Sequence, residues 1–182
     1  MIQTTPKRAE RHQQGDRGAI GNSYAPLGVK YFDFDFDVHF THKGWDGYVR
    51  CVRGEAAPRP SLTDNRNGTV TDSHTGLTWQ QGEPGGMSWG MALDFCEGLE
   101  LGDAIDWRLP NVKELLSLTD QTRFHPAVDP TFFPGVQTSE YWSSTTDAYN
   151  PELAWPVDFD NGSINRSHKR PHHAVRCVRG GH

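Results

Sequence analysis

The sequence predicts an α+β fold, with one complete domain over residues 61–182. Three observations carry this prediction: a hairpin pattern opens the domain, two helical patterns follow, and several short strand patterns close it. Strands and helices that are grouped in this way are typical of antiparallel α+β domains. The chain is 35% hydrophobic and 11% aromatic. It has no apolar run of the ~20 residues that a membrane span needs, so it is predicted to be globular without membrane insertion.

The first third of the chain is predicted to hold a short β-hairpin. Residues 1–28 are polar and show no periodic pattern, and no apolar stretch of a secretory signal is visible there. Apolar and polar side chains then alternate over residues 32–40, which predicts a half-buried strand. A glycine-marked turn and a second strand over residues 49–52 complete a hairpin at residues 29–54. Two prolines and the lack of an apolar period identify residues 55–60 as a linker.

The complete domain opens with a predicted hairpin and a predicted helix. Strand patterns at residues 69–71 and 77–79 surround a turn at 73–76. The helix is predicted after Ser88, which is a suitable N-cap residue, because apolar side chains then recur at helical spacing. These side chains are Ala92, Phe95, Cys96 and Leu99.

A second helix is predicted to begin after Pro110. Asn111 followed by Glu114 is a capping-box pattern. An apolar helix face is supplied by Val112, Leu115, Leu116 and Leu118. Residues 120–135 contain three prolines and are predicted to be a loop. Short strands are then predicted at 141–145, 154–159 and 174–178. Four aromatic side chains of these motifs are interpreted as core rather than as sugar-stacking groups: Trp107, Tyr141, Trp142 and Trp155.

Part of the sequence occurs twice. Residues 49–54 return as residues 175–180, with the same six letters VRCVRG, 126 positions further on. Two shorter matches precede this one in the same order: 41–43 with 167–169, and 33–35 with 158–160. We therefore interpret the hairpin at 29–54 as the tail of an upstream copy of the domain.

Charge is distributed unevenly along the chain. Residues 91–160 carry a net charge of -10, whereas residues 161–182 carry +5. The segment 165–173 lies between the last two predicted strands, and such connections often hold binding residues on a rigid frame. An arginine can bind sulfate, phosphate or carboxylate through two hydrogen bonds, and lysine adds a point charge. The predicted ligand-binding residues, for an anionic ligand, are Asn165, Arg166, His168, Lys169, Arg170 and His172.

Other interpretations of this segment remain open. The basic end can instead pack beside the acidic body of the same domain. The equivalent segment of the first copy, residues 40–47, is not basic, which fits either a variable display loop on a constant frame or ordinary loop drift. A domain that assembles with copies of itself, with the hairpin at 29–54 added to a sheet edge, is the structural alternative. Basic and aromatic residues are not interleaved, so a nucleic-acid partner is not favoured.

The candidate metal ligands give weak patterns. His172 and His173 are adjacent, so a strand would point them to opposite faces, and neighbouring basic side chains repel a cation. Asp158 and Asp160 on one strand face supply at most part of the oxygen set that calcium needs. We therefore predict no cofactor, with calcium at these two aspartates as the weaker alternative.

The three cysteines do not suggest an active site. Cys51 and Cys177 are equivalent positions of the repeat, so only one of them can pair with Cys96 as its native partner. One disulfide or three buried thiols both fit the pattern. Cys96 lies within a predicted helix on its apolar face, whereas reactive cysteines need an electropositive, partly exposed site. No Cys-x-x-Cys motif is present, and no catalytic activity is predicted.

Five motifs, in order, cover nearly the whole complete domain: residues 64–72, 75–80, 106–115, 141–145 and 175–180. On these motifs, residues 64–180 resemble the Lcl C-terminal domain family, bacterial domains that include the C-terminal domain of the Legionella collagen-like protein. The resemblance implies an extracellular or cell-surface module for binding or adhesion, with sulfated or other anionic glycans as the ligand class.

A more distant resemblance is to C-type-lectin-like folds. Cys96 on the first helix and Cys177 on a late strand are similar to the helix-to-last-strand disulfide of that fold, which implies the pair Cys96–Cys177. Cys51 would then be free or paired between chains. The tripeptides with which that fold often binds calcium and sugar are absent. Formylglycine-generating enzymes also share the fold, but they need paired active-site cysteines that a single Cys177 does not supply, so such an oxidase is the lesser alternative.

Overall fold

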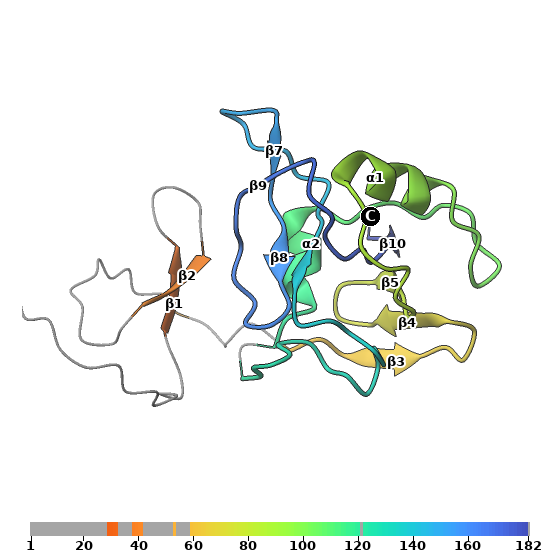
Figure 1. Ribbon diagram of the computed structural model, residues 1–182. Helices are drawn as coiled ribbons and strands as arrows, with labels where there is room; N and C mark the ends of the chain where they lie inside the picture. The colour runs from red at the N-terminus through yellow and green to blue at the C-terminus, as the bar shows by residue number, and fades with distance from the viewer. Residues whose placement is uncertain (1–28, 33–37, 42–52, 54–58, 121, 182) are drawn as a thin grey trace, which may run out of the picture.

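A four-stranded antiparallel sheet organises the complete domain. The computed structural model describes residues 29–32, 38–41, 53, 59–120 and 122–181 (Figure 1). The sheet consists of β3 (Leu62–Asp64), β4 (Thr69–Asp72), β5 (Leu77–Gln80) and β10 (Val178–Gly180), in the order β10-β5-β4-β3. Its two edge strands, β10 and β3, come from opposite ends of the domain sequence. The last strand, β10, pairs with β5 of the first hairpin and so closes the fold.

The hairpin of β4 and β5 forms where the sequence predicts it. Val70 pairs with Trp79, and Asp72 pairs with Leu77. Gly76 has a φ of +72°, a left-handed conformation that glycine adopts at little cost, and this permits the tight turn. The buried Asp72 accepts hydrogen bonds from the backbone N–H groups of Ser61 and His74, at 2.9 and 3.0 Å. The same carboxylate therefore ties the turn to the start of β3, a strand that the sequence pattern did not predict.

Both predicted helices are present. Helix α1 (Trp89–Glu97) begins after Ser88, and helix α2 (Val112–Ser117) begins after Asn111. The Asn111 side chain accepts hydrogen bonds from the N–H groups of Lys113 and Glu114, and the Glu114 side chain accepts one from the Asn111 N–H. This reciprocal capping box satisfies backbone donors that a six-residue helix cannot satisfy internally.

Two apolar cores hold these elements together. The first lies between α2 and the sheets, and its largest fully buried members are Trp79, Leu115, Leu118, Phe133, Tyr141 and Phe159. The second lies under α1 and contains Ala92, Cys96, Trp107, Leu109, Trp142, Ala154, Val175 and Cys177. The four aromatic residues that were interpreted as core are all buried, at 9% exposure or less.

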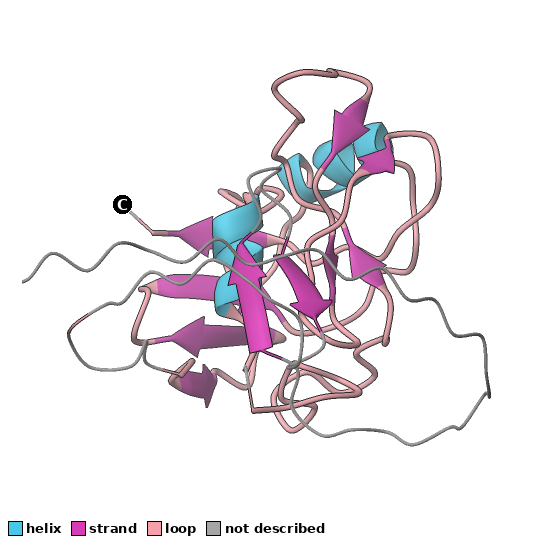
Figure 2. Cartoon of the chain, turned by 90° about the vertical axis from the view of Figure 1, so that its left-hand side faces the viewer, coloured by secondary structure: helices cyan, strands magenta, loops and turns pink. Residues whose placement is uncertain are grey.

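The closing strands are shorter than the sequence patterns predict. They are β6 (Glu140–Tyr141) paired with β8 (Val157–Asp158), and β7 (Leu153–Ala154) paired with β9 (Ser167–His168). Loops connect these two-residue strands and make up much of this half of the domain (Figure 2). The predicted loop at residues 120–135 has no helix or strand in its described residues. None of the helices in the described ranges is long or apolar enough to cross a membrane.

The first third of the chain contains a strand pair that differs from the predicted one. Strands β1 (Val29–Phe32) and β2 (Val38–Thr41) pair antiparallel, with Phe32 opposite Val38 and Val29 opposite Thr41. Phe32 and Phe40 therefore lie on two paired strands and not along one, because the chain reverses direction between them. The second predicted strand, at residues 49–52, lies outside the described residues.

The register of β1 and β2 matches that of a pair in the complete domain. Val29–Thr41 corresponds to Ala154–Ser167, and Phe32–Val38 corresponds to Val157–Ile164, at sequence offsets of 125 and 126. These are the offsets that the sequence repeat shows.

Candidate anion-binding face

The basic segment 165–173 crosses the end of the domain that carries α1 (Figure 1). Its first part contains β9, whose residue His168 pairs with Leu153 of β7. Its middle is fastened to α1, because the carbonyl of Lys169 accepts a hydrogen bond from the Trp89 N–H at 3.1 Å. Its end pairs with Met87 through two backbone hydrogen bonds of His173, at 3.0 and 3.1 Å. The segment is therefore fixed to the rest of the domain at three points.

Exposure alternates along this segment. Arg166, His168, Arg170, Pro171 and His172 are exposed, whereas Asn165, Ser167, Lys169 and His173 are partly buried. Around β9 this alternation has the period of two of an extended strand, and the chain then bends at residues 169–171. We call the exposed set of Arg166, His168, Arg170 and His172 the basic face. It contains two guanidinium groups and two imidazoles, and it holds four of the six predicted ligand-binding residues.

The other two predicted residues point toward the frame. The Asn165 amide donates to the Glu140 carboxylate at 2.8 Å. The Lys169 ammonium donates to the Thr146 hydroxyl at 2.9 Å and lies 3.8 Å from the centre of the Trp89 ring. A cation over an aromatic face is attracted by the ring quadrupole. Lys169 thus anchors the segment, and its charge is partly engaged within the domain.

Arg166 is held in place from two sides. Its Nε lies 3.3 Å from a carboxylate oxygen of Asp147, and its guanidinium carbon lies 4.9 Å from the centre of the Trp155 ring. The pKa of Asp147 is lowered, first by hydrogen bonds from the backbone N–H groups of Asn150 and Tyr149, and further by the charge of Arg166. Asp147 is therefore an anion at neutral pH that orients Arg166 and offsets part of its charge.

His168, Arg170 and His172 form the unengaged part of the basic face. Within the described part of the chain, none of their side chains makes a hydrogen bond, ion pair or ring contact. Their donors therefore remain available to a ligand.

A histidine beside a serine lies behind this face, but it lacks the geometry of a catalytic pair. The His173 Nε2 lies 2.8 Å from the Ser167 hydroxyl and 3.3 Å from the Glu140 carboxylate. In a nucleophile–base–acid arrangement, the acid contacts the other ring nitrogen and thereby orients the base. Here both contacts are at one nitrogen. Burial lowers the pKa of His173, although the charge of Glu140 acts in the opposite direction.

Asp158 and Asp160 serve the local turn. Asp158 accepts hydrogen bonds from the Asp160 N–H at 2.9 Å and from the Asn161 amide at 3.3 Å, and Asp160 contacts the ring of His125. Burial raises the pKa of Asp158, and the nearby charges of Asp160 and Glu140 raise it further. Among the described residues, no group of three His, Cys, Asp or Glu side chains is placed to hold a metal ion.

The charged residues of the motifs at 106–115 and 175–180 form ion pairs within the domain. Arg108 forms two hydrogen bonds with Glu114, at 2.7 and 2.8 Å, and Arg179 lies 2.7 Å from Asp106. Arg176 is completely buried and pairs with Glu83. The Arg179–Asp106 and Arg176–Glu83 pairs join segments far apart in sequence, and none of these residues forms part of the basic face.

The disulfide that the resemblance implied is present. Cys96 of α1 is bonded to Cys177, with a Cα–Cα distance of 5.4 Å and a sequence separation of 81. Both residues are completely buried in the second core, so their role is structural. Cys51 lies outside the described residues.

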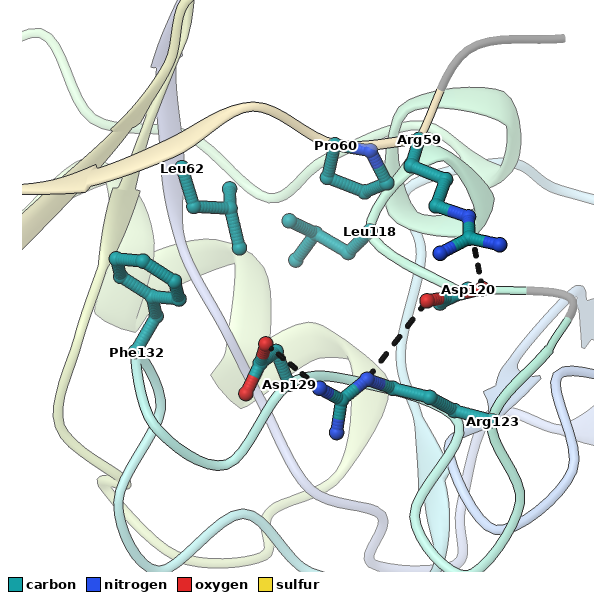
Figure 3. A pocket seen from close by; sticks show the side chains of 8 residues that line it. All are labelled: Arg59, Pro60, Leu62, Leu118, Asp120, Arg123, Asp129 and Phe132. Atoms are coloured by element: carbon teal, nitrogen blue, oxygen red, sulfur yellow. Dashed lines mark hydrogen bonds and ion pairs between the residues drawn. The ribbon is translucent and has the colours of Figure 1, made fainter.

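A hollow of about 210 Å³ lies where the linker enters the domain (Figure 3). Its charged side chains compensate one another: Arg123 lies 2.9 Å from Asp129 and 3.7 Å from Asp120, and Arg59 lies 4.0 Å from Asp120. The apolar part of its lining consists of Pro60, Leu62, Leu118 and Phe132. The charges of the hollow are balanced and no free donors converge on it. Two described residues of the predicted linker, Arg59 and Pro60, form part of its wall.

The fold and this surface define a small α+β domain, closed by one disulfide, that presents several exposed basic side chains on one short segment. The chain belongs to the Lcl C-terminal domain family, whose model matches residues 68–179. The match includes the hairpin of β4 and β5, both helices, both cysteines of the disulfide and the whole basic segment. A search of curated proteins found no match.

Proposed function

We propose that this domain is a non-catalytic module that binds sulfated or other anionic glycans at a cell surface, through the basic face. One observation carries the proposal: Arg166, His168, Arg170 and His172 lie exposed on one short segment that backbone hydrogen bonds hold to the rest of the domain at three points. Donors on a segment that is already fixed lose little conformational freedom when they bind a chain of repeated anionic groups. Arginine is suited to sulfate and carboxylate, which it can bind through two hydrogen bonds.

Two further features support this assignment. The disulfide fits an oxidising compartment outside the cytosol, and membership of the family fits a surface or adhesion role. The bond between the first helix and the segment that precedes the last strand also fits a C-type-lectin-like fold, which we propose as the finer classification. The arrangement of Ser167, His173 and Glu140 favours a structural role over catalysis.

Arg170 provides the sharpest test, because its side chain has no partner in the described part of the chain. Arg170→Glu reverses one charge of the basic face without breaking a contact of the frame. We expect retention on a heparin column to fall to lower salt, with affinity reduced on the order of tenfold or more, since a hydrogen bond to a charged group contributes ~1.5–3 kcal/mol.

Lys113→Glu is the matched control. Lys113 is exposed on α2, and its reversal changes the net charge by the same amount at another place. Elution of this variant should match that of the original protein. Absence of retention of the original protein at low salt, or an equal loss in both variants, would show that the basic face is not the site.

A further inference from the structure

An exposed aromatic residue, Tyr149, lies in the loop that adjoins the basic segment. Tyr149 is 89% exposed, the highest value among the large hydrophobic side chains that are exposed in the described residues. It lies in the loop between Thr146 and Leu153, which precedes β7. A phenol ring that is this exposed gains little from burial within the domain, so its face is accessible to a ligand.

The loop that presents Tyr149 is rigidly built. One oxygen of Asp147 accepts hydrogen bonds from the N–H groups of Tyr149 and Asn150, at 2.8 and 2.9 Å. The Asp147 N–H donates to the Leu153 carbonyl at 3.0 Å, which closes the base of the loop. The Asn150 side chain accepts from the Glu152 N–H at 3.1 Å. The backbone at Tyr149 is therefore fixed while its ring faces solvent.

The same carboxylate connects this loop to the basic face. The second oxygen of Asp147 lies 3.3 Å from the Arg166 Nε, so one buried aspartate positions both the tyrosine backbone and the guanidinium. The two segments also adjoin along β7 and β9, where Leu153 is opposite His168. At the end of that pair, the Lys169 N–H donates to the Glu152 carbonyl at 3.1 Å.

We infer that Tyr149 is the stacking surface for a sugar ring whose anionic substituents bind the basic face. This inference rests on the proposed function and narrows its ligand class. The apolar C–H face of a pyranose can pack on an aromatic ring, while its sulfate or carboxylate groups reach the neighbouring Arg166 and His168. The site would then select sulfated or acidic polysaccharides over polyanions that have no ring.

Two polymers separate ring recognition from charge recognition. Heparin carries sulfate groups on sugar rings, whereas poly(vinyl sulfate) carries them on a flexible hydrocarbon chain. Tyr149→Ala should weaken heparin binding roughly three- to tenfold, the range expected for loss of one aromatic stacking contact. Its binding to poly(vinyl sulfate) should be unchanged. Tyr149→Phe should bind heparin as the original protein does, because the ring is retained.

Phe124→Ala is the matched control, since Phe124 is also an exposed aromatic residue, at 63%, in a different loop. It should bind both polymers normally. If Tyr149→Ala binds heparin normally while Arg170→Glu loses it, the stacking role is wrong and the basic face stands. An equal loss of both polymers in Tyr149→Ala also overturns the stacking role. If the original protein binds no heparin, both proposals fail.

Discussion

The guanidinium of Arg176 is enclosed by the end of β5, the residues that follow it and the ring of Phe133. It donates to the carbonyls of Gln80 and Gln81, at 2.6 and 3.0 Å, and pairs with the carboxylate of Glu83. The Phe133 ring lies 4.3 Å from its central carbon. Burial raises the pKa of Glu83, and the charge of Arg176 counteracts this by favouring the carboxylate. A motif arginine thus fixes the chain between β5 and α1 in place of binding a ligand.

Removing one member of this pair leaves the other charged and buried. Arg176→Met should therefore lower the free energy of unfolding by roughly 3–5 kcal/mol. Replacing both residues, as Arg176→Met with Glu83→Met, should cost less than the sum of the two single changes, because no uncompensated charge remains. Urea unfolding of the three variants measures this coupling. Additive losses would mean that the two side chains act independently.

Single residues also mark the limit of what the sequence pattern revealed about the site. The charge of segment 165–173 was evident, but the direction of each side chain was not. Lys169 points inward because Trp89 and Thr146 lie beside it, and both contacts come from segments remote in sequence. Tyr149 was not among the predicted site residues. Its only local signal was an aromatic residue within the polar turn sequence Asp-Ala-Tyr-Asn-Pro.

Among the helices and strands, α2 depends most on capping for its stability. A helix of six residues is too short to be stable alone, so capping and tertiary contacts must hold it. Glu114 belongs to the capping box and also receives both hydrogen bonds from Arg108. Burial alone would raise the pKa of Glu114, but the hydrogen bonds from Arg108 and Asn111, with the charge of Arg108, lower it overall.

This shift gives α2 a definite pH dependence. The pKa of Glu114 is lower in the folded protein than its ordinary value of 4.5, so ionisation favours folding. The resulting stability is complete above about pH 4.5 and is lost as the pH falls through the folded pKa. Glu114→Gln removes the titrating group, so its free energy of unfolding should fall less steeply between about pH 5 and pH 3. Identical slopes for the two proteins, from denaturant titrations across that range, would contradict this assignment.

Helices and closing strands differed in how well the sequence predicted them. The helices carry local signals, namely apolar spacing and the Asn111–Glu114 pattern, and both were found in the predicted places. Strands β6 to β9 have two residues each, and their pairing comes from segments brought together by the whole fold. A period of two cannot be recognised over so short a span, so their bounds, and the presence of β9, were not predictable.

At the scale of the whole molecule, the sequence repeat and the pairing of β1 with β2 concern the same two parts of the chain. The pair of β1 and β2 has the register of residues 154–157 with 164–167, and the interpretation of residues 29–54 as the tail of an upstream copy stays a prediction. In the described residues, Cys96 is bonded to Cys177, the later of the two equivalent cysteines of the sequence repeat.

This bond joins the first helix to the residue that directly precedes the last strand, β10. The Cys96–Cys177 link spans 81 positions, which restricts the unfolded chain strongly and should contribute roughly 3–5 kcal/mol to the free energy of unfolding. The double variant Cys96→Ala with Cys177→Ala should unfold at a correspondingly lower denaturant concentration, as should the reduced protein. Cys51→Ser is the control and should leave the midpoint unchanged, because Cys51 takes no part in this bond. If reduction leaves the midpoint of the original protein unchanged, the two apolar cores alone hold the domain closed.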